Sequence, residues 1–238
     1  MLEGDSEIIM TSELESKAYV DLTLDVMRDF GVFAENEAYS RFKIKGSQNY
    51  KNCNYKVESD FSQAAFWIVA EALGNQISYK NMNINSKQSD RVILDIVKKY
   101  KTATGEDIII DVKDCPDLVP ILAVLASFYF GKTKIINAAR VRIKESDRLK
   151  AISCELNKLG ANIIEFEDGL DIEGVAEFSG GVVESWNDHR IAMALAIAST
   201  RCTSKLTIIG SECVKKSYPH FWEDFKMLGG KLDEWNSR

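Results

Sequence analysis

The chain has 238 residues, of which 45% are apolar, and its formal net charge is −6 at pH 7. This length and composition are typical of an ordinary globular protein that buries a sizeable core in one large or two smaller domains. The acidic balance and the absence of a lysine or arginine block exclude a broad surface for nucleic acid or anionic membrane. An anion would therefore have to be held by local clusters of cations.

The N-terminus and the cysteines indicate where the protein works. The segment MLEGDSEIIM lacks the basic and apolar regions of a signal peptide, and no apolar run reaches the about 20 residues that a membrane helix needs. The five cysteines show no metal-ligand spacing and are typical of reduced thiols. We therefore expect a cytoplasmic protein with no membrane partner.

A pattern of amphipathic helix, glycine and two strands repeats along the chain. In the first copy, residues 20–46, Val20, Leu24 and Met27 share one helical face and Phe30–Gly31 closes the helix. Residues 91–112 form a degenerate copy without the glycine. The last copy, residues 220–235, ends inside its strand, and Pro219 is expected to start its helix.

The second copy, residues 148–174, shows the pattern most clearly. An amphipathic helix leads to two alternating segments, with Asp168–Gly169 predicted as the hairpin turn between them. Helix ends about 60 to 70 residues apart are too widely spaced for a solenoid. The predicted fold class is therefore α/β, with repeated α/β subdomains that combine mixed sheets with buried parallel helices.

Between these copies lie three helices that are apolar nearly all round and are therefore predicted to be buried. Asp60, Asp117 and Asp188 come directly before them, and an aspartate there is typically an N-cap. If the repeat aligns these helices, their positive ends point the same way and attract an anion. A binding cleft is expected at that end.

The segment from Ala139 to Gly160 places several charges just ahead of an amphipathic helix that Gly160 terminates. Cations recur at two further helix starts, at Arg190 and at Lys215–Lys216. Arginines beside free helix N–H groups indicate a site for carboxylate or phosphate. The alternative is a solvated turn capped by Ser146, with Glu145 and Arg148 paired at i,i+3.

Three segments, RIKESDRL, NDHRIAMALAIA and KKSYPHFWEDFKMLG, occur in this order and resemble signature segments of the 3-phosphoshikimate 1-carboxyvinyltransferase (EPSP synthase) family. The segments SKAYVDLTLDVMRDFGV and ESDFSQAAFWIVA resemble its middle part. The resemblance implies transfer of the enolpyruvyl group from phosphoenolpyruvate to the 5-hydroxyl of shikimate 3-phosphate, with release of phosphate. It also implies that no metal or organic cofactor is used.

The resemblance assigns roles to single residues. Asp117 and Glu145 match the family's carboxylates, and two carboxylates in different environments can divide the proton transfers; which step each performs stays open. The remaining matches are substrate-binding residues: Arg148 and Arg190 for the carboxylate of phosphoenolpyruvate, Lys216 near its phosphate, Lys144 as an orienting lysine, and Ser16 and Tyr19 for shikimate 3-phosphate.

Plainer interpretations remain for some of these residues. Ser16 can be an N-cap, Tyr19 a packed aromatic and Lys216 a solvated lysine. His189 can cap or pack rather than act in catalysis. Arg140 stands where several family members carry asparagine.

Family members are nearly twice as long as this chain. Residues 1–57 resemble the last repeat of the family's first domain, and residues 58–238 resemble most of its second domain. The family's N-terminal substrate contacts do not occur here, so we expect a C-terminal portion that needs the missing N-terminal half. The alternatives are a non-catalytic anion-binding or partner-dependent module and, less favoured, a UDP-N-acetylglucosamine enolpyruvyl transferase, which would lack this combination of motifs.

Overall fold

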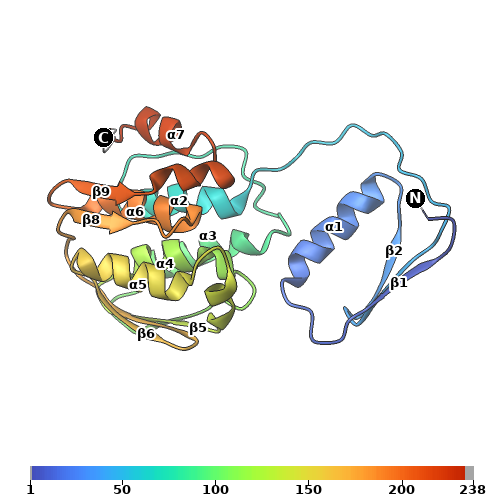
Figure 1. The fold of residues 1–238 in the computed structure, drawn as a ribbon, viewed down its shortest axis with the longest axis horizontal. Coiled ribbons are helices and arrows are strands. Elements are labelled where there is room, and N and C mark those ends of the chain that lie inside the picture. The colour runs from blue at the N-terminus through green and yellow to red at the C-terminus, as the bar shows by residue number, and fades with distance from the viewer. Residues whose placement is uncertain (1, 234–238) are drawn as a thin grey trace.

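The computed structural model describes residues 2–233, which form two α/β units joined by an extended linker (Figure 1). The first unit holds β1 (Ser6–Ile9), α1 (Lys17–Asp29), β2 (Ala34–Glu37) and β3 (Arg41–Ile44). Its three strands pair antiparallel in the order β1-β3-β2. Residues 45–60 contain no helix or strand, and the second unit begins with α2 (Phe61–Ala72).

The helix of the first unit is amphipathic, as its spacing of apolar residues predicts, but no residue of α1 is buried. Val20, Leu24 and Met27 are only half-buried. Gly31 ends the helix with a φ of 81°, a left-handed conformation that favours glycine. The apolar side of this unit is therefore incompletely covered within the described residues.

The core of the second unit is built on α2, α4 (Val119–Ala126) and α6 (His189–Ala198), which contact one another. Every residue of α4 and of α6 is buried, as is more than half of α2. Helices that are apolar all round leave no polar face for solvent, so they must lie inside the unit. This confirms the predicted buried helices.

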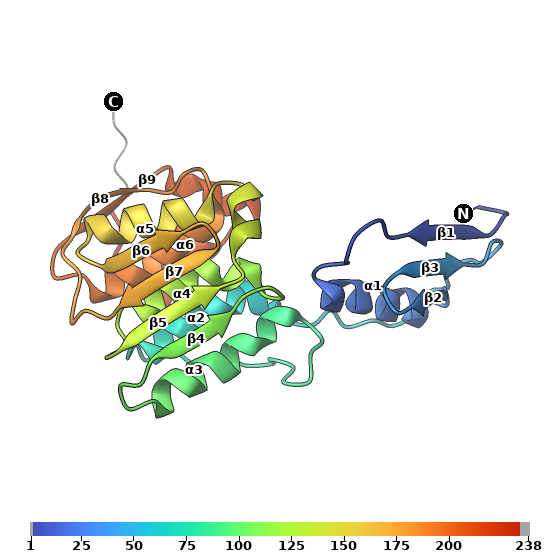
Figure 2. The ribbon, with the colours of Figure 1, turned by 90° about the horizontal axis from the view of Figure 1, so that it is seen from below.

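A mixed four-stranded sheet covers one side of these helices (Figure 2). Its strands lie in the order β4-β5-β7-β6, with β4 and β5 parallel and the other two pairings antiparallel. In β5 buried and exposed residues alternate, as expected for a sheet with one face on the core. The bounds are β4 (Ile108–Asp111), β5 (Lys132–Ile136), β6 (Asn162–Phe166) and β7 (Gly169–Glu173).

The remaining elements surround this core. The strands β8 (Gly181–Glu184) and β9 (Leu206–Ile209) form a parallel pair, and α3 (Ile93–Thr102), α5 (Arg148–Lys158) and α7 (Phe221–Met227) are the amphipathic helices of the repeat. Short 3-10 helices connect them: η1 (Ser89–Val92), η2 (Pro116–Leu118), η3 (Ala139–Ile143), η4 (Ser199–Arg201) and η5 (Ser211–Lys216). Within residues 2–233, no helix is both long and apolar enough to cross a membrane.

The second copy of the repeat is observed as α5, β6 and β7, but its turn lies one residue earlier than predicted. Phe166 pairs with Gly169, so the turn residues are Glu167 and Asp168. Gly169 belongs to β7 and has an ordinary φ. Glycine is needed there because a Cβ would overlap the backbone oxygen of Ile135 in the neighbouring strand.

The other copies are less regular. The degenerate copy supplies only α3 and β4, without a second strand before η2. In the last copy α7 begins at Phe221, so Pro219 lies in the preceding turn and does not start the helix, contrary to the prediction. Residues 231–233 form no strand, and the rest of the strand expected there lies outside the described residues.

Candidate active site

The N-terminal ends of the three buried helices converge on the side chain of Arg190. This residue lies in the first turn of α6, and its guanidinium donates to the Oγ of Ser62, at the start of α2, at 3.1 Å. Its Nη2 also donates to Asp117 Oδ2, just before α4, at 3.1 Å. Three helix starts therefore meet at one point, and their aligned dipoles make that point positive.

A second arginine reaches the same point from α5. The side chain of Arg148 is only 1% exposed, and each of its donor nitrogens has a carboxylate partner. It donates to Asp117 at 2.8 Å, to Glu145 at 2.6 Å and to Asp188 at 2.8 Å. The guanidinium fork is thus held rigidly by three segments of the chain.

The acidic residues before the helices have different roles. Asp60 caps α2 and Asp188 caps α6, as predicted, since each accepts from a backbone N–H of the first turn. Asp117 makes no cap: it lies in η2 and binds Arg148 and Arg190, with Lys144 Nζ 3.6 Å away. The predicted cap is wrong for Asp117 because the 3-10 turn separates it from the start of α4.

The cap of α5 also differs from the plainer interpretation of the charged segment. Asp147 caps the helix by accepting from the backbone N–H of Lys150, whereas Ser146 donates its hydroxyl to Asp188 at 3.0 Å. The predicted pair of Glu145 and Arg148 is present. In this pair Arg148 is buried and Glu145 is exposed, so Glu145 joins the arginine cluster from its solvent-facing edge.

The neighbouring arginines keep the buried carboxylates of Asp117 and Asp188 ionised. Burial raises the pKa of Asp117, but the charges of Arg190 and Arg148 outweigh burial and leave that pKa below its usual value. Burial likewise opposes ionisation of Asp188, yet its bond to Arg148 lowers the pKa overall. Burial lowers the pKa of His189, with a contribution from Arg190, so its imidazole is neutral at neutral pH.

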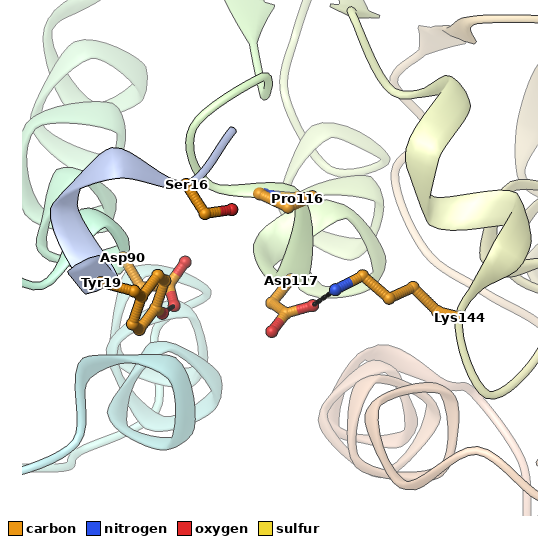
Figure 3. Close-up of a pocket in the computed structure, with 6 residues that line it drawn as sticks. All are labelled: Ser16, Tyr19, Asp90, Pro116, Asp117 and Lys144. Atoms are coloured by element: carbon orange, nitrogen blue, oxygen red, sulfur yellow. Dashed lines mark hydrogen bonds and ion pairs between the residues drawn. The ribbon is translucent and has the colours of Figure 1, made fainter. Parts of the chain in front are cut away.

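A cavity of about 320 Å³ lies beside Asp117 at the junction of the two units (Figure 3). Figure 3 shows Tyr19 and Asp90 facing each other on one side and Asp117 joined to Lys144 on the other. Hydroxyl, carboxylate and ammonium groups thus surround a space that both units line. The lining residues are Ser16, Tyr19, Asp90, Pro116, Asp117 and Lys144.

Ser16 and Tyr19 reach this cavity from the start of α1. Ser16 stands at the N-cap position of α1, as the plainer interpretation predicts, but it has a φ of 55° and its side chain makes no cap bond. Its Oγ accepts from Arg140 Nη1 at 3.0 Å, and Arg140 also pairs with Glu15 at 2.8 Å. The hydroxyl of Tyr19 donates to Asp90 of the second unit.

Lys216 approaches the site without touching its carboxylates. Its Nζ donates to the backbone oxygen of Asn187 at 2.5 Å. Trp186 and Asn187 have φ values of 54° and 53°, and Glu155 holds this strained turn by accepting from the Trp186 indole at 2.8 Å. Because Asp188 follows directly, the turn places Lys216 next to the arginine cluster.

The structure thus brings together Asp117, Glu145, Lys144, Arg148 and Arg190 in direct contacts, with Lys216 beside them and Ser16 and Tyr19 on the other side of the cavity. Within residues 2–233, no group of His, Cys, Asp and Glu has the arrangement of a metal site.

The sequence of this chain matches the family model of EPSP synthase (3-phosphoshikimate 1-carboxyvinyltransferase) over residues 1–225. The chain belongs to the EPSP synthase family. It is 58% identical to the 3-phosphoshikimate 1-carboxyvinyltransferase of Clostridium acetobutylicum and 53% identical to that of Clostridium kluyveri, with 99% of this chain covered in each comparison. It spans 58% of the length of each relative.

Solved structures agree with this family. The EPSP synthase of Acinetobacter baumannii superimposes with a TM-score of 0.81 at 27% identity, covering 95% of this chain and 57% of that one. The enolpyruvyl transferase NikO from Streptomyces tendae has the same fold at 16% identity, with a TM-score of 0.69 over 96% of this chain and 56% of that one. The predicted family and fold class are therefore confirmed.

Sequence reasoning missed several residues of this candidate site. Asp90 lies in the lining of the cavity, Ser62 binds Arg190, and Asp188 binds Arg148 as well as capping α6. The sequence offers a signal only for Asp188, which stands beside the helix start that carries Arg190. Asp90 and Ser62 enter the site through long-range packing, which spacing along the chain does not show.

Proposed function

We propose that this chain carries the C-terminal part of an active site that transfers the enolpyruvyl group from phosphoenolpyruvate to the 5-hydroxyl of shikimate 3-phosphate. Phosphate is released, and the product serves the synthesis of chorismate and aromatic amino acids. The observation that carries the proposal is the junction of Arg148 and Arg190 at Asp117, where three helix N-termini converge. The chain spans only part of its relatives, so the complete reaction needs their remaining part as well.

The two arginines suit the carboxylate of phosphoenolpyruvate, because a guanidinium presents two parallel donors to a carboxylate. In the present arrangement these donors are occupied by acidic side chains, so phosphoenolpyruvate must compete with Asp117 for them. The cations Arg148, Arg190, Lys144 and Lys216 are equal in number to the carboxylates Asp117, Glu145, Asp188 and Asp90. A dianion or trianion is therefore attracted weakly until further cations join the site.

Asp117 is the group that we assign to the attacking hydroxyl. It is ionised and lines the cavity opposite Ser16 and Tyr19, where shikimate 3-phosphate would lie. When phosphoenolpyruvate takes over Arg148 and Arg190, their effect on Asp117 weakens, which raises its pKa and makes it a better base. Substrate binding would thus prepare the carboxylate for proton transfer.

Glu145 is assigned to the methylene carbon of phosphoenolpyruvate. In the addition step, the 5-oxygen bonds to C2, its proton passes to Asp117, and Glu145, which must enter this step protonated, delivers its proton to C3. In the elimination step, the carboxylate of Glu145 takes a proton back from C3, the electron pair of that C–H bond restores the double bond, and the C2–O bond to phosphate breaks. Asp117 then passes its proton to the departing phosphate. Asp117 and Glu145 hold different groups of Arg148, so one arginine keeps both carboxylates in place.

The partner of this chain in the reaction is the part that its relatives have in addition. We propose that residues 1–57 are the last repeat of the family's first domain and that residues 58–238 are most of the second. The half-buried apolar face of α1 supports an additional packing partner for the first unit. Unpaired cysteines throughout the chain agree with a cytoplasmic location, which we also propose.

A second candidate function is a non-catalytic anion-binding or partner-dependent module. The incomplete span of the chain favours it for the isolated polypeptide. Enolpyruvyl transfer and non-catalytic anion binding would use the same anion site. A measurement of catalytic activity therefore distinguishes the two functions, and a measurement of binding does not. For UDP-N-acetylglucosamine enolpyruvyl transfer, no contact in the site offers support.

Binding of phosphoenolpyruvate to the chain tests the shared site. We expect weak binding by isothermal titration calorimetry, with an affinity that falls as ionic strength rises. Arg190→Glu should reduce the affinity at least about tenfold, because a charged hydrogen bond is lost and a repulsion added. Arg190→Gln checks the same loss with less disturbance of folding, and Lys98→Glu on the exposed side of α3 is the control. Equal affinity in all four proteins would contradict the proposal.

A further inference from the structure

The two units meet in a part-buried side-chain contact that the proposed mechanism does not use. Tyr19, at the start of α1, donates its hydroxyl to Asp90 on η1 of the second unit. The other side-chain contacts described between the units are ion pairs and hydrogen bonds of partly or fully exposed residues, such as Lys113 with Glu13 and Arg140 with Glu15. Asp90 differs from them because it is 1% exposed and lines the cavity beside Asp117.

Asp90 is unusual among the acidic residues of the site because no cation touches it. One oxygen accepts from Tyr19, and the other has no hydrogen-bond partner among residues 2–233. The charged groups that act on it are Asp60 before α2, Asp117 on η2 and Arg190 on α6. Arg190 favours the ionisation of Asp90 and the two neighbouring carboxylates oppose it, but Arg190 donates its hydrogen bonds to Ser62 and Asp117.

Burial of this carboxyl raises its pKa to about 6, although the hydrogen bond from Tyr19 acts in the opposite direction. Asp117 lies in the same cavity and has a lowered pKa because two arginines outweigh its burial. Two carboxylates that line one cavity therefore change charge in different pH ranges. A buried polar atom without a partner is destabilising, so the unpaired oxygen of Asp90 needs an explanation.

We propose that Asp90 is a positioning residue of the substrate site. Its ionised carboxylate holds the hydroxyl of Tyr19 across the junction of the two units. This bond fixes the side of the cavity that Tyr19 lines, where the polyhydroxylated anionic substrate would bind. The inference rests on the proposed function for the identity of that substrate. The contact itself rests only on the geometry of Tyr19 and Asp90. Because Tyr19 belongs to the other unit, the same bond also sets how α1 approaches the second unit.

The bond between Tyr19 and Asp90 determines how the position of Tyr19 should depend on pH. Above about pH 6 the carboxylate is ionised and accepts a charge-assisted hydrogen bond from Tyr19. As the pH falls through that value the carboxyl becomes neutral, the bond weakens, and Tyr19 is held less firmly. The position of Tyr19 should therefore change in a range where Asp117 stays ionised.

Carbon-13 NMR of the chain labelled at the Cζ atoms of tyrosine tests the contact without any substrate. The resonance of Tyr19, assigned by its loss in Tyr19→Phe, should shift with a midpoint near pH 6 and lose this titration in Asp90→Asn. The matched control is Tyr39, whose hydroxyl donates to the carboxylate of Asp21 within the first unit. Asp21→Asn should change the Tyr39 resonance and leave the titration of Tyr19 intact. A Tyr19 resonance that is unchanged by Asp90→Asn would overturn the inference.

Binding of shikimate 3-phosphate tests the consequence for the site. Where the chain binds it, Asp90→Asn and Tyr19→Phe should each weaken the affinity about tenfold at pH 7.5. The double variant should be no weaker than either single one, because both remove the same bond. Normal affinity in Asp90→Asn would overturn the positioning role. A wild-type chain that binds neither substrate would contradict the proposed function, and the tyrosine resonance would then decide the inference alone.

Discussion

Arg148 and Asp188 form the most completely buried ion pair of the site, with side-chain exposures of 1% and 0%. Such a pair is weak support for stability as a whole, because desolvation offsets much of the attraction. Removing one partner is different, since it leaves a charge buried without compensation. The pair therefore holds Arg148 rigidly in the site, but replacing either residue is expected to destabilise the fold.

Asp188→Asn should lower the free energy of unfolding by about 3–5 kcal/mol, the usual effect of breaking a buried ion pair. Urea denaturation of the chain measures this change. Asp233→Asn is the control, because Asp233 pairs with Lys205 at the surface, where both side chains are more than 70% exposed. A similar small change in both variants would show that the buried pair is not important for stability.

The same residue predicts a pH dependence of stability. The folded-state pKa of Asp188 is below its usual value of 3.8, so the stabilisation is fully present above that value and is lost as the pH falls through the folded pKa. As the pH falls below 3.8, the wild-type chain should lose stability more steeply than Asp188→Asn. Parallel pH profiles of the melting temperature would contradict the assigned ionisation.

The two carboxylates of the proposed mechanism can be tested in a protein that joins this chain to the complementary part of the Clostridium acetobutylicum relative. Asp117→Asn and Glu145→Gln should each lower kcat by at least about a hundredfold, the low end for general acid–base catalysis, with a smaller effect on KM. Steady-state kinetics measure both constants. If either variant kept a nearly normal kcat, the carboxylate that it lacks would be only an ion-pair partner of Arg148 and not a group in proton transfer.

At the residue scale, sequence reasoning succeeded where a charge stands at the start of a recognisable helix. Arg148 and Arg190 could be found in this way, as could the cap that Asp188 makes, because a helix start presents free N–H groups whatever the fold. Asp90 could not be found, since its burial depends on α2 and α3 packing around η1. For Asp117 the sequence also allows a cap, because it does not show the 3-10 turn that separates this residue from α4.

At the scale of elements, the buried helices were the most predictable feature. Helices α4 and α6 are apolar on all sides and are entirely buried, as their composition requires. The first-unit helix α1 shows the limit of this reasoning. Its apolar residues follow the helical period, but none is buried, because burial depends on a packing partner and not on the pattern alone.

Gly169→Ala tests the packing of the mixed sheet. A methyl group at this position meets the backbone oxygen of Ile135 in β5, so either β7 or β5 must shift. Overpacking of this kind typically costs about 1–3 kcal/mol, which a thermal melt followed by circular dichroism would detect. Gly4→Ala is the control, because nothing lies within 4 Å of a Cβ at Gly4 and its φ is not positive. Equal melting temperatures would place the close approach of the strands in doubt.

At the scale of the whole molecule, two units joined by a linker meet at a polar junction, and the candidate site lies on both sides of it. Repeated α/β architecture could be predicted from the helix, glycine and strand pattern. The approach of the units could not, because contacts such as Arg140 with Ser16 join residues more than a hundred positions apart. The sequence contains no local signal for such pairs.

Phosphate release from phosphoenolpyruvate and shikimate 3-phosphate tests the central claim most directly, with the chain alone and with the chain joined to the complementary part of the Clostridium acetobutylicum relative. We expect negligible release from the chain alone, since it spans 58% of that relative and lacks the remaining substrate contacts. The joined protein should release phosphate only when both substrates are present, and Asp117→Asn should abolish most of that release. Robust release by the chain alone, or release by the joined protein that Asp117→Asn leaves unchanged, would contradict the account.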